Sequence, residues 1–112
     1  FLYMLAYAEQ EMGAATALMS CGPAFVALVV DAFADAGVAH GLESAQARRL
    51  VVETMAGSAA FLDANGLDAM GLQSRVATPG GLTEKGLGVL EEKGLREAFA
   101  AAVDLVVETG GR

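Results

Sequence analysis

A run of 19 positions without a charged side chain, from Met12 to Val30, constrains the fold of this chain most strongly. By length alone the run approaches the roughly 20 apolar residues that a bilayer-spanning helix needs. Its middle reads Ser20-Cys21-Gly22-Pro23, however, and a proline there removes an N–H that a lipid-exposed helix must keep bonded. Neither Lys or Arg flanks nor a Trp belt marks its ends. We therefore expect no membrane span, but a break between two helices buried in protein.

Composition narrows the class of protein further. The 112 residues carry 7 Lys and Arg against 14 Asp and Glu, a net charge of −7, which argues against a nucleic-acid partner. A hydrophobic content of 54% excludes a disordered chain and, in so small a domain, favours buried contact between subunits. A single cysteine rules out an intramolecular disulfide and favours a reducing cytoplasm. The length fits one domain, residues 1–112.

Apolar residues recur at helical spacing along nearly the whole chain, and no strand pattern of useful length occurs. The fold class that this predicts is all-α, a helical bundle. We expect helices over residues 1–12, 23–36, 44–64, 84–92 and 95–108, with a short turn or helix over 67–76. Glycines are expected to end or separate several of them, namely Gly37, Gly66 and Gly94.

The helix expected over residues 23–36 is apolar on both faces, relieved only by Asp31 and Asp35. A helix that is apolar nearly all round is normally buried on most sides, and one small domain offers few such places. Obligate interfaces resemble a domain core cut in half. We therefore expect a homodimer, or a higher oligomer, whose protomers do not separate into folded monomers.

The segment Thr78-Pro79-Gly80-Gly81-Leu82-Thr83 is the one loop with special chemistry. Two glycines after a proline allow unusual backbone conformations, and the helix that follows adds N–H groups without intrahelical partners. Together these favour a small anion such as a carboxylate. The spacing alone favours the plainer alternative, a tight turn with Thr83 as helix N-cap. Glu84 is expected to point outward, with Lys85 partly offsetting its charge.

Other signatures of chemistry are weak. His40 stands alone in a connection, with no second His or Cys at ligand spacing, so we expect no metal site. Cys21 is expected to pack, and the pair Glu91 and Glu92 to be a solvated helix end. Leu87 stands where a P-loop requires Lys, and the dinucleotide-binding fingerprint G-x-G-x-x-G after a strand does not occur.

Several motifs together resemble the C-terminal domain of the pyrroline-5-carboxylate reductase family. The resemblance runs from about residue 17 to about residue 108 and is carried by Cys21-Gly22-Pro23-Ala24-Phe25, by Ala34-Asp35-Ala36-Gly37-Val38, and most specifically by Val76-Ala77-Thr78-Pro79-Gly80-Gly81-Leu82-Thr83. It implies a helical domain like the C-terminal domain of 6-phosphogluconate dehydrogenase, forming an interlocked dimer. Residues 1–16 would then be a connecting helix, after an upstream Rossmann domain that this chain, opening at Phe1, does not contain.

The resemblance also implies a site and an activity. The family reduces 1-pyrroline-5-carboxylate to L-proline with NADPH or NADH, which the Rossmann domain binds, so the chain by itself is expected to bind no cofactor and to be inactive. The loop would hold the substrate carboxylate through Thr78, Gly80, Gly81, the Leu82 N–H and Thr83. Thr83 is the candidate catalytic residue near the ring nitrogen, and Val76 would line the substrate pocket.

Some positions depart from the family pattern. Met19-Ser20-Cys21-Gly22-Pro23 stands where the family often has Ser-Gly-Ser-Gly-Pro, Thr78 replaces a serine, and Ser74 replaces an acidic residue. These changes leave a second interpretation open, a non-enzymatic helical dimerisation domain of a reductase-like paralogue. The presence of a strand followed by G-x-G-x-x-G upstream of Phe1 would separate the two.

Overall fold

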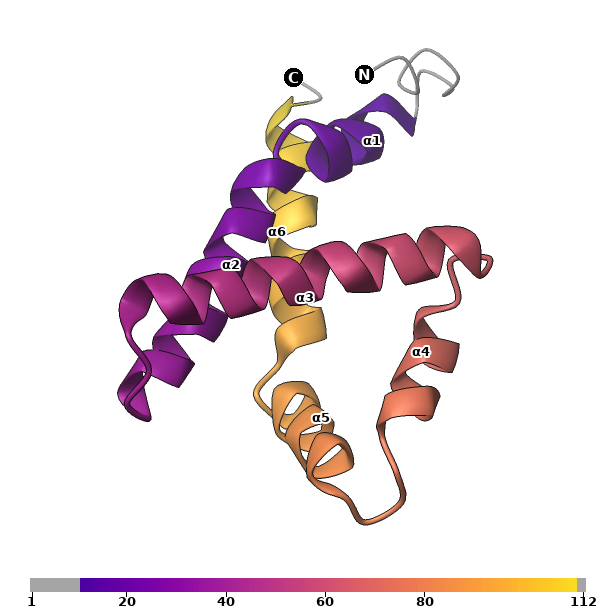
Figure 1. The fold of residues 1–112 in the computed structure, drawn as a ribbon. Coiled ribbons are helices and arrows are strands. Elements are labelled where there is room, and N and C mark those ends of the chain that lie inside the picture. The colour runs from indigo at the N-terminus through magenta and orange to yellow at the C-terminus, as the bar shows by residue number, and fades with distance from the viewer. Residues whose placement is uncertain (1–10, 111–112) are drawn as a thin grey trace. The chain divides into compact units, whose positions relative to one another are not determined.

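A computed structural model describes residues 11–110, and within this range the chain is helical with no strand. The helices are α1 (Met12–Met19), α2 (Gly22–Ala39), α3 (Ser44–Ala64), α4 (Ala69–Val76), α5 (Leu82–Glu92) and α6 (Leu95–Gly110) (Figure 1). The predicted all-α class is confirmed. The helix expected over residues 1–12 and most of the connecting segment over residues 1–16 lie outside the described residues.

The predicted break in the uncharged run is confirmed, and it falls between α1 and α2. The backbone N–H groups of Ser20 and Cys21 both donate to the carbonyl of Thr16, at 2.8 and 3.2 Å, which closes the last turn of α1. Pro23 is the second residue of α2, where its missing N–H has no intrahelical acceptor to lose. A continuous 19-residue apolar helix is therefore not formed.

The predicted end of α2 at Gly37 is wrong, because the helix continues to Ala39. Gly41 has the positive φ of +102°, and its N–H donates to the Val38 carbonyl while that of Leu42 donates to the Gly37 carbonyl. This pair of bonds is a Schellman motif, in which a glycine of left-handed conformation, here Gly41, follows the helix. Gly37 lies inside the helix and contributes only its carbonyl as an acceptor. Two glycines four residues apart made the boundary ambiguous in the sequence.

The chain divides into two compact units, and the first contains residues 1–26 and 88–112. Here α1 packs against α6, and Ala15 and Ala17 are buried. A Cβ at Gly13 would lie 3.5 Å from a methyl carbon of Val107, an ordinary van der Waals distance, so the two helices are in contact here.

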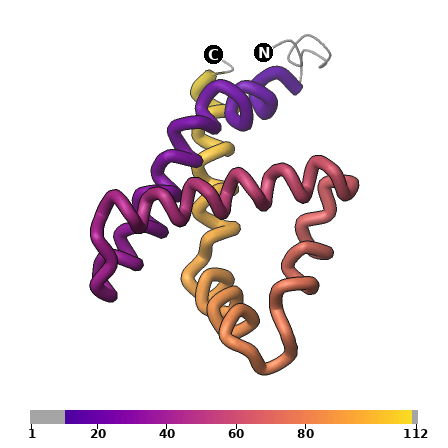
Figure 2. Tube along the Cα trace, viewed as in Figure 1, coloured from indigo at the N-terminus to yellow at the C-terminus, as the bar shows by residue number. Residues whose placement is uncertain are grey.

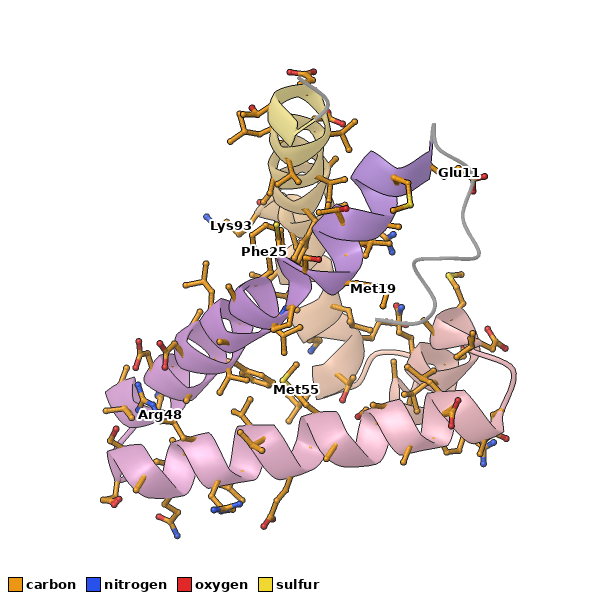
Figure 3. All side chains as sticks on the ribbon, turned by 90° about the horizontal axis from the view of Figure 1, so that it is seen from above. Glu11, Met19, Phe25, Arg48, Met55 and Lys93 are labelled. Atoms are coloured by element: carbon orange, nitrogen blue, oxygen red, sulfur yellow. The ribbon has the colours of Figure 1, made fainter. Side chains whose placement is uncertain are left out.

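The second unit contains residues 27–87, whose chain Figure 2 traces from α2 through α3 and α4. Its core is small: Ala34 of α2 is buried against Ala47 and Val51 of α3, with Val30 and Met55 partly buried beside them. Figure 3 labels Met55 and Arg48 on α3. The Arg48 guanidinium reaches across to α2, where Nη2 lies 3.1 Å from Asp31 Oδ1 and 3.5 Å from Asp35 Oδ1.

Most apolar side chains of α2 remain uncovered within the described chain. Ala34 is its only buried residue, whereas Phe33 is 59% and Leu28 68% exposed. By length and composition α2 would also suffice to cross a membrane, a test that core helices of soluble proteins pass as well. The helix carries Asp31 and Asp35, which pair with Arg48. An apolar surface of this kind marks an interaction site.

Candidate functional site

The loop singled out in the sequence forms a tight turn. The Gly81 N–H donates to the Thr78 carbonyl at 2.9 Å, and Gly80 has a φ of +74°. Proline at the second position and a positive φ at the third are the pattern of a type II β-turn. The unusual backbone conformation predicted for this segment is therefore present, and Gly80 is the residue that adopts it.

The second glycine of the loop is required for a different reason. A Cβ at Gly81 would lie 2.5 Å from Thr78 Oγ1 and 3.2 Å from the Thr78 carbonyl oxygen. No atom lies within 4 Å of a Cβ built at Gly80, where only the backbone conformation restricts the residue type. Gly80 is thus needed for its backbone conformation, and Gly81 for its close contact with Thr78.

Helix α5 begins at Leu82, two residues before the predicted start at Glu84. The Lys85 N–H donates to the Gly81 carbonyl at 3.2 Å, which makes Gly81 the N-cap residue. Thr83 is the second residue of the helix, so the alternative in which Thr83 is the N-cap is wrong. The turn is already closed at Gly81, so the helix starts without a hydroxyl cap.

Backbone N–H donors gather where the turn meets α5. The first N–H groups of a helix have no intrahelical acceptor, and here they belong to Leu82, Thr83 and Glu84. The helix dipole favours negative charge at the same end. The Leu82 side chain is 88% exposed and the Thr83 hydroxyl lies on an exposed residue, so solvent reaches this end of α5. Val76 ends α4, two residues before the turn, and is also exposed.

The Glu84 side chain does not point away from the loop, so that expectation is wrong. Its Oε1 accepts a hydrogen bond from the Gly80 N–H at 3.0 Å. A glutamate in the first turn of a helix commonly reaches back to a backbone N–H just before the helix. That spacing is visible in the sequence and makes a bond from the loop to Glu84 possible, without deciding which rotamer the side chain adopts.

Two cavities lie elsewhere in the second unit, and neither includes the loop. One, of about 390 Å³, lies between α2 and α3 and is lined almost entirely by apolar groups, including Phe33, Leu42 and Leu50. The other, of about 180 Å³, lies beside Arg75, whose guanidinium carbon is 5.0 Å from the centre of the Phe61 ring. The Arg75–Phe61 contact joins α3 and α4, and no spacing rule in the sequence pointed to it.

The other residues considered in the sequence, His40, Cys21 and Glu91, form no contact with the loop that the structure records. His40 is exposed and Cys21 half-buried. The Arg96 Nε–H donates a bifurcated hydrogen bond to both carboxylate oxygens of Glu91. This bond and the negative charge of Glu91 raise the pKa of Arg96. Over residues 11–110, no group of three or more His, Cys, Asp or Glu side chains is placed to hold a metal ion.

Comparisons with known proteins agree with the motifs. The family described as "Pyrroline-5-carboxylate reductase dimerisation" matches residues 9–111. The pyrroline-5-carboxylate reductase of Lophium arboricola is 47% identical over 92 residues, covering 82% of this chain and 28% of that protein. A crystal structure of Plasmodium falciparum pyrroline carboxylate reductase with NADP bound superposes with a TM-score of 0.87 at 33% identity, covering 92% of this chain and 39% of that one.

A second solved structure, the 1-pyrroline-5-carboxylate reductase of Streptococcus pyogenes, gives a TM-score of 0.88 at 31% identity, covering 92% of this chain and 40% of that one. The chain thus spans between a quarter and two fifths of the length of these relatives. Since the family match covers every described residue, the chain belongs to the pyrroline-5-carboxylate reductase dimerisation family.

Proposed function

We propose that the chain is the C-terminal substrate-binding and dimerisation domain of an NAD(P)H-dependent reductase that converts 1-pyrroline-5-carboxylate to L-proline. The observation that carries the proposal is the junction of the Thr78–Gly81 turn with the start of α5, which gathers backbone N–H groups for a carboxylate. The names of the relatives support the activity, and the NADP in the Plasmodium structure supports the cofactor.

In this proposal the chain supplies binding and orientation. When bound, the nicotinamide cofactor supplies the hydride that reduces the C=N carbon. The substrate carboxylate is held at the turn formed by Thr78, Gly80 and Gly81, through the Gly80 and Leu82 N–H groups and Thr83, and Val76 contributes to the pocket. The Gly81 N–H is used by the turn itself, so Gly81 contributes by shaping the turn. An unassisted threonine hydroxyl is a poor acid near neutral pH. Thr83 therefore positions the ring nitrogen by donating a hydrogen bond to it. A proton passed from the hydroxyl to the nitrogen is replaced in the same step by one from solvent water, which reaches this exposed residue.

The cofactor is assigned to a part of the reductase outside this chain. The described residues are helical, so they offer no strand-to-helix turn of the kind that binds a dinucleotide pyrophosphate. The chain alone is expected to have no reductase activity and no measurable affinity for NADPH or NADH. Calorimetric binding of either nucleotide at micromolar strength would contradict this.

The proposed partner is a second copy of the chain. The resulting homodimer can in turn assemble into a higher oligomer. The family description names dimerisation, and the uncovered apolar side chains of α2 supply the surface. Obligate interfaces are apolar in this way. A reducing cytoplasm is the proposed location, in keeping with the single, unpaired cysteine.

The substitution Thr83→Ala in the full-length reductase tests the site. If the hydroxyl bonds a charged or reacting group, kcat/KM falls by about 5- to 150-fold, equal to about 1–3 kcal/mol of transition-state stabilisation. Thr83→Ser retains most of the activity. Because Thr83 is not the N-cap, the melting temperature should change little. Unchanged kinetics in Thr83→Ala would contradict the site, whereas a full-length protein without reductase activity would favour a non-enzymatic dimerisation domain.

A further inference from the structure

The loop proposed to bind the substrate carboxylate already holds a carboxylate of this chain. Glu84 Oε1 lies 3.0 Å from the backbone nitrogen of Gly80, within hydrogen-bonding distance. The Gly81 N–H is committed to the Thr78 carbonyl inside the turn. Of the two glycine N–H groups of the loop, one is therefore used by the turn and the other by Glu84.

The charge of Glu84 also acts on any anion at this place. A carboxylate in the first turn takes up the favourable field of the helix N-terminus. A second carboxylate within a few ångströms is repelled, because like charges at that distance disfavour each other even in a medium partly exposed to water. An incoming carboxylate thus meets both a missing donor and a repulsive charge.

Glu84 is placed so that it can leave. It is an exposed residue, and the hydrogen bond to Gly80 is the contact that holds its side chain against the loop. Lys85 follows it directly in the helix. The Glu84 side chain can therefore turn into solvent when another anion takes its place at the Gly80 N–H.

We propose that Glu84 sets the affinity of this site for anionic substrates, by competing with the substrate carboxylate for the Gly80 N–H. The inference rests on the proposed function and adds a residue that controls the Michaelis constant. Binding proceeds by exchange of one carboxylate for another, and the Michaelis constant is raised by the work of displacing Glu84. An imine without a carboxylate does not need this exchange.

Steady-state kinetics of the full-length reductase test the inference, with 1-pyrroline-5-carboxylate as the varied substrate. Glu84→Gln removes the charge at nearly constant shape, and Glu84→Ala removes the competing group while keeping a good helix former. In both variants we expect KM to fall about tenfold, equal to about 1.4 kcal/mol, with kcat within about twofold of the parent value. The inhibition constant of L-proline should fall by the same factor.

Glu92→Gln is the matched control, since Glu92 is the last residue of the same helix and is also exposed. It changes the net charge equally and should leave KM unchanged. The opposite role for Glu84, that of holding the turn in shape, predicts a raised KM in both variants. A raised or unchanged KM, or failure of both variants to fold, would overturn the inference.

The kinetics of the Glu84 variants and of Thr83→Ala distinguish a failure of this inference from a failure of the proposed function. If Thr83→Ala impairs the reaction while the Glu84 variants leave KM unchanged, only the competition by Glu84 is refuted. If Thr83→Ala has no kinetic effect, the carboxylate site itself is refuted.

Discussion

Helix α2 and the Thr78–Gly81 turn obtain their stability in opposite ways. The turn is closed by its own hydrogen bond from Gly81 to Thr78, and Glu84 at the start of α5 bonds to it within four residues. Helix α2 exposes Phe33 and Leu28 and buries Ala34 alone. Local bonds define the turn, whereas contacts within residues 11–110 leave most of the α2 surface uncovered.

Substitutions in α2 and in the turn should therefore affect different properties of the protein. A change in the apolar surface of α2 should affect assembly, and through it the stability of the whole protein, because the stability of an obligate dimer depends on protomer concentration. A change in the turn should affect the loop and substrate binding while leaving assembly intact.

The largest effect is expected for Phe33→Asp. Phe33 lines the apolar cavity between α2 and α3, and in the proposed dimer its carboxylate replacement would be buried without a partner. We expect a loss of about 3 kcal/mol or more, seen as aggregation or unfolding at micromolar concentration. Analytical ultracentrifugation and circular dichroism measure the two outcomes.

The control for this substitution is His40→Asp, which adds a carboxylate at an exposed position just after the end of α2. It should remain dimeric. A compact, folded monomer in Phe33→Asp, or in the parent chain, would break the comparison by showing that α2 is stable without a partner.

A smaller effect is expected for Gly81→Ala, which tests whether the turn is defined locally. The new Cβ would lie 2.5 Å from Thr78 Oγ1, so the turn must shift. We expect a loss of about 1–3 kcal/mol of stability, as for other overpacked sites. Thermal unfolding of the full-length protein measures it, and the sedimentation coefficient should stay that of the assembled parent.

A double-mutant cycle sharpens this test. In Thr78→Ala the clashing hydroxyl is absent, so Gly81→Ala should cost less in that background, with a coupling of about 0.5 kcal/mol or more. Strict additivity of the two changes would show that the close contact between Thr78 and Gly81 does not limit the turn.

The smallest effect is expected for Arg48→Ala at the α2–α3 contact. The Arg48 side chain is 39% exposed, and its partners Asp31 and Asp35 are 60% and 67% exposed. Exposed ion pairs contribute about 0–1 kcal/mol, and the difference from the parent should shrink as salt is added. Denaturant unfolding at low and high salt checks this. A loss of several kcal/mol would mean that the two helices depend on charge and not on apolar contact.

Much of the fold was predictable because its signals are local. The helix from Ser44 to Ala64 was predicted with its observed bounds, since a polar start and Asn65-Gly66 mark its ends. The end of α2 was not, because Gly37 and Gly41 are both plausible terminators and only backbone hydrogen bonds distinguish them. The turn was predicted from Pro79-Gly80-Gly81, whereas the inward position of Glu84 depends on a side-chain rotamer that the spacing permits but does not dictate.

A crystal structure of the full-length reductase with its product L-proline tests the proposed carboxylate site most directly. The carboxylate of L-proline should lie about 2.7–3.2 Å from backbone nitrogens of the Gly80–Thr83 segment, a hydrogen-bonding distance, with the Thr83 hydroxyl close to the ring nitrogen. A product carboxylate bound away from this turn would contradict it.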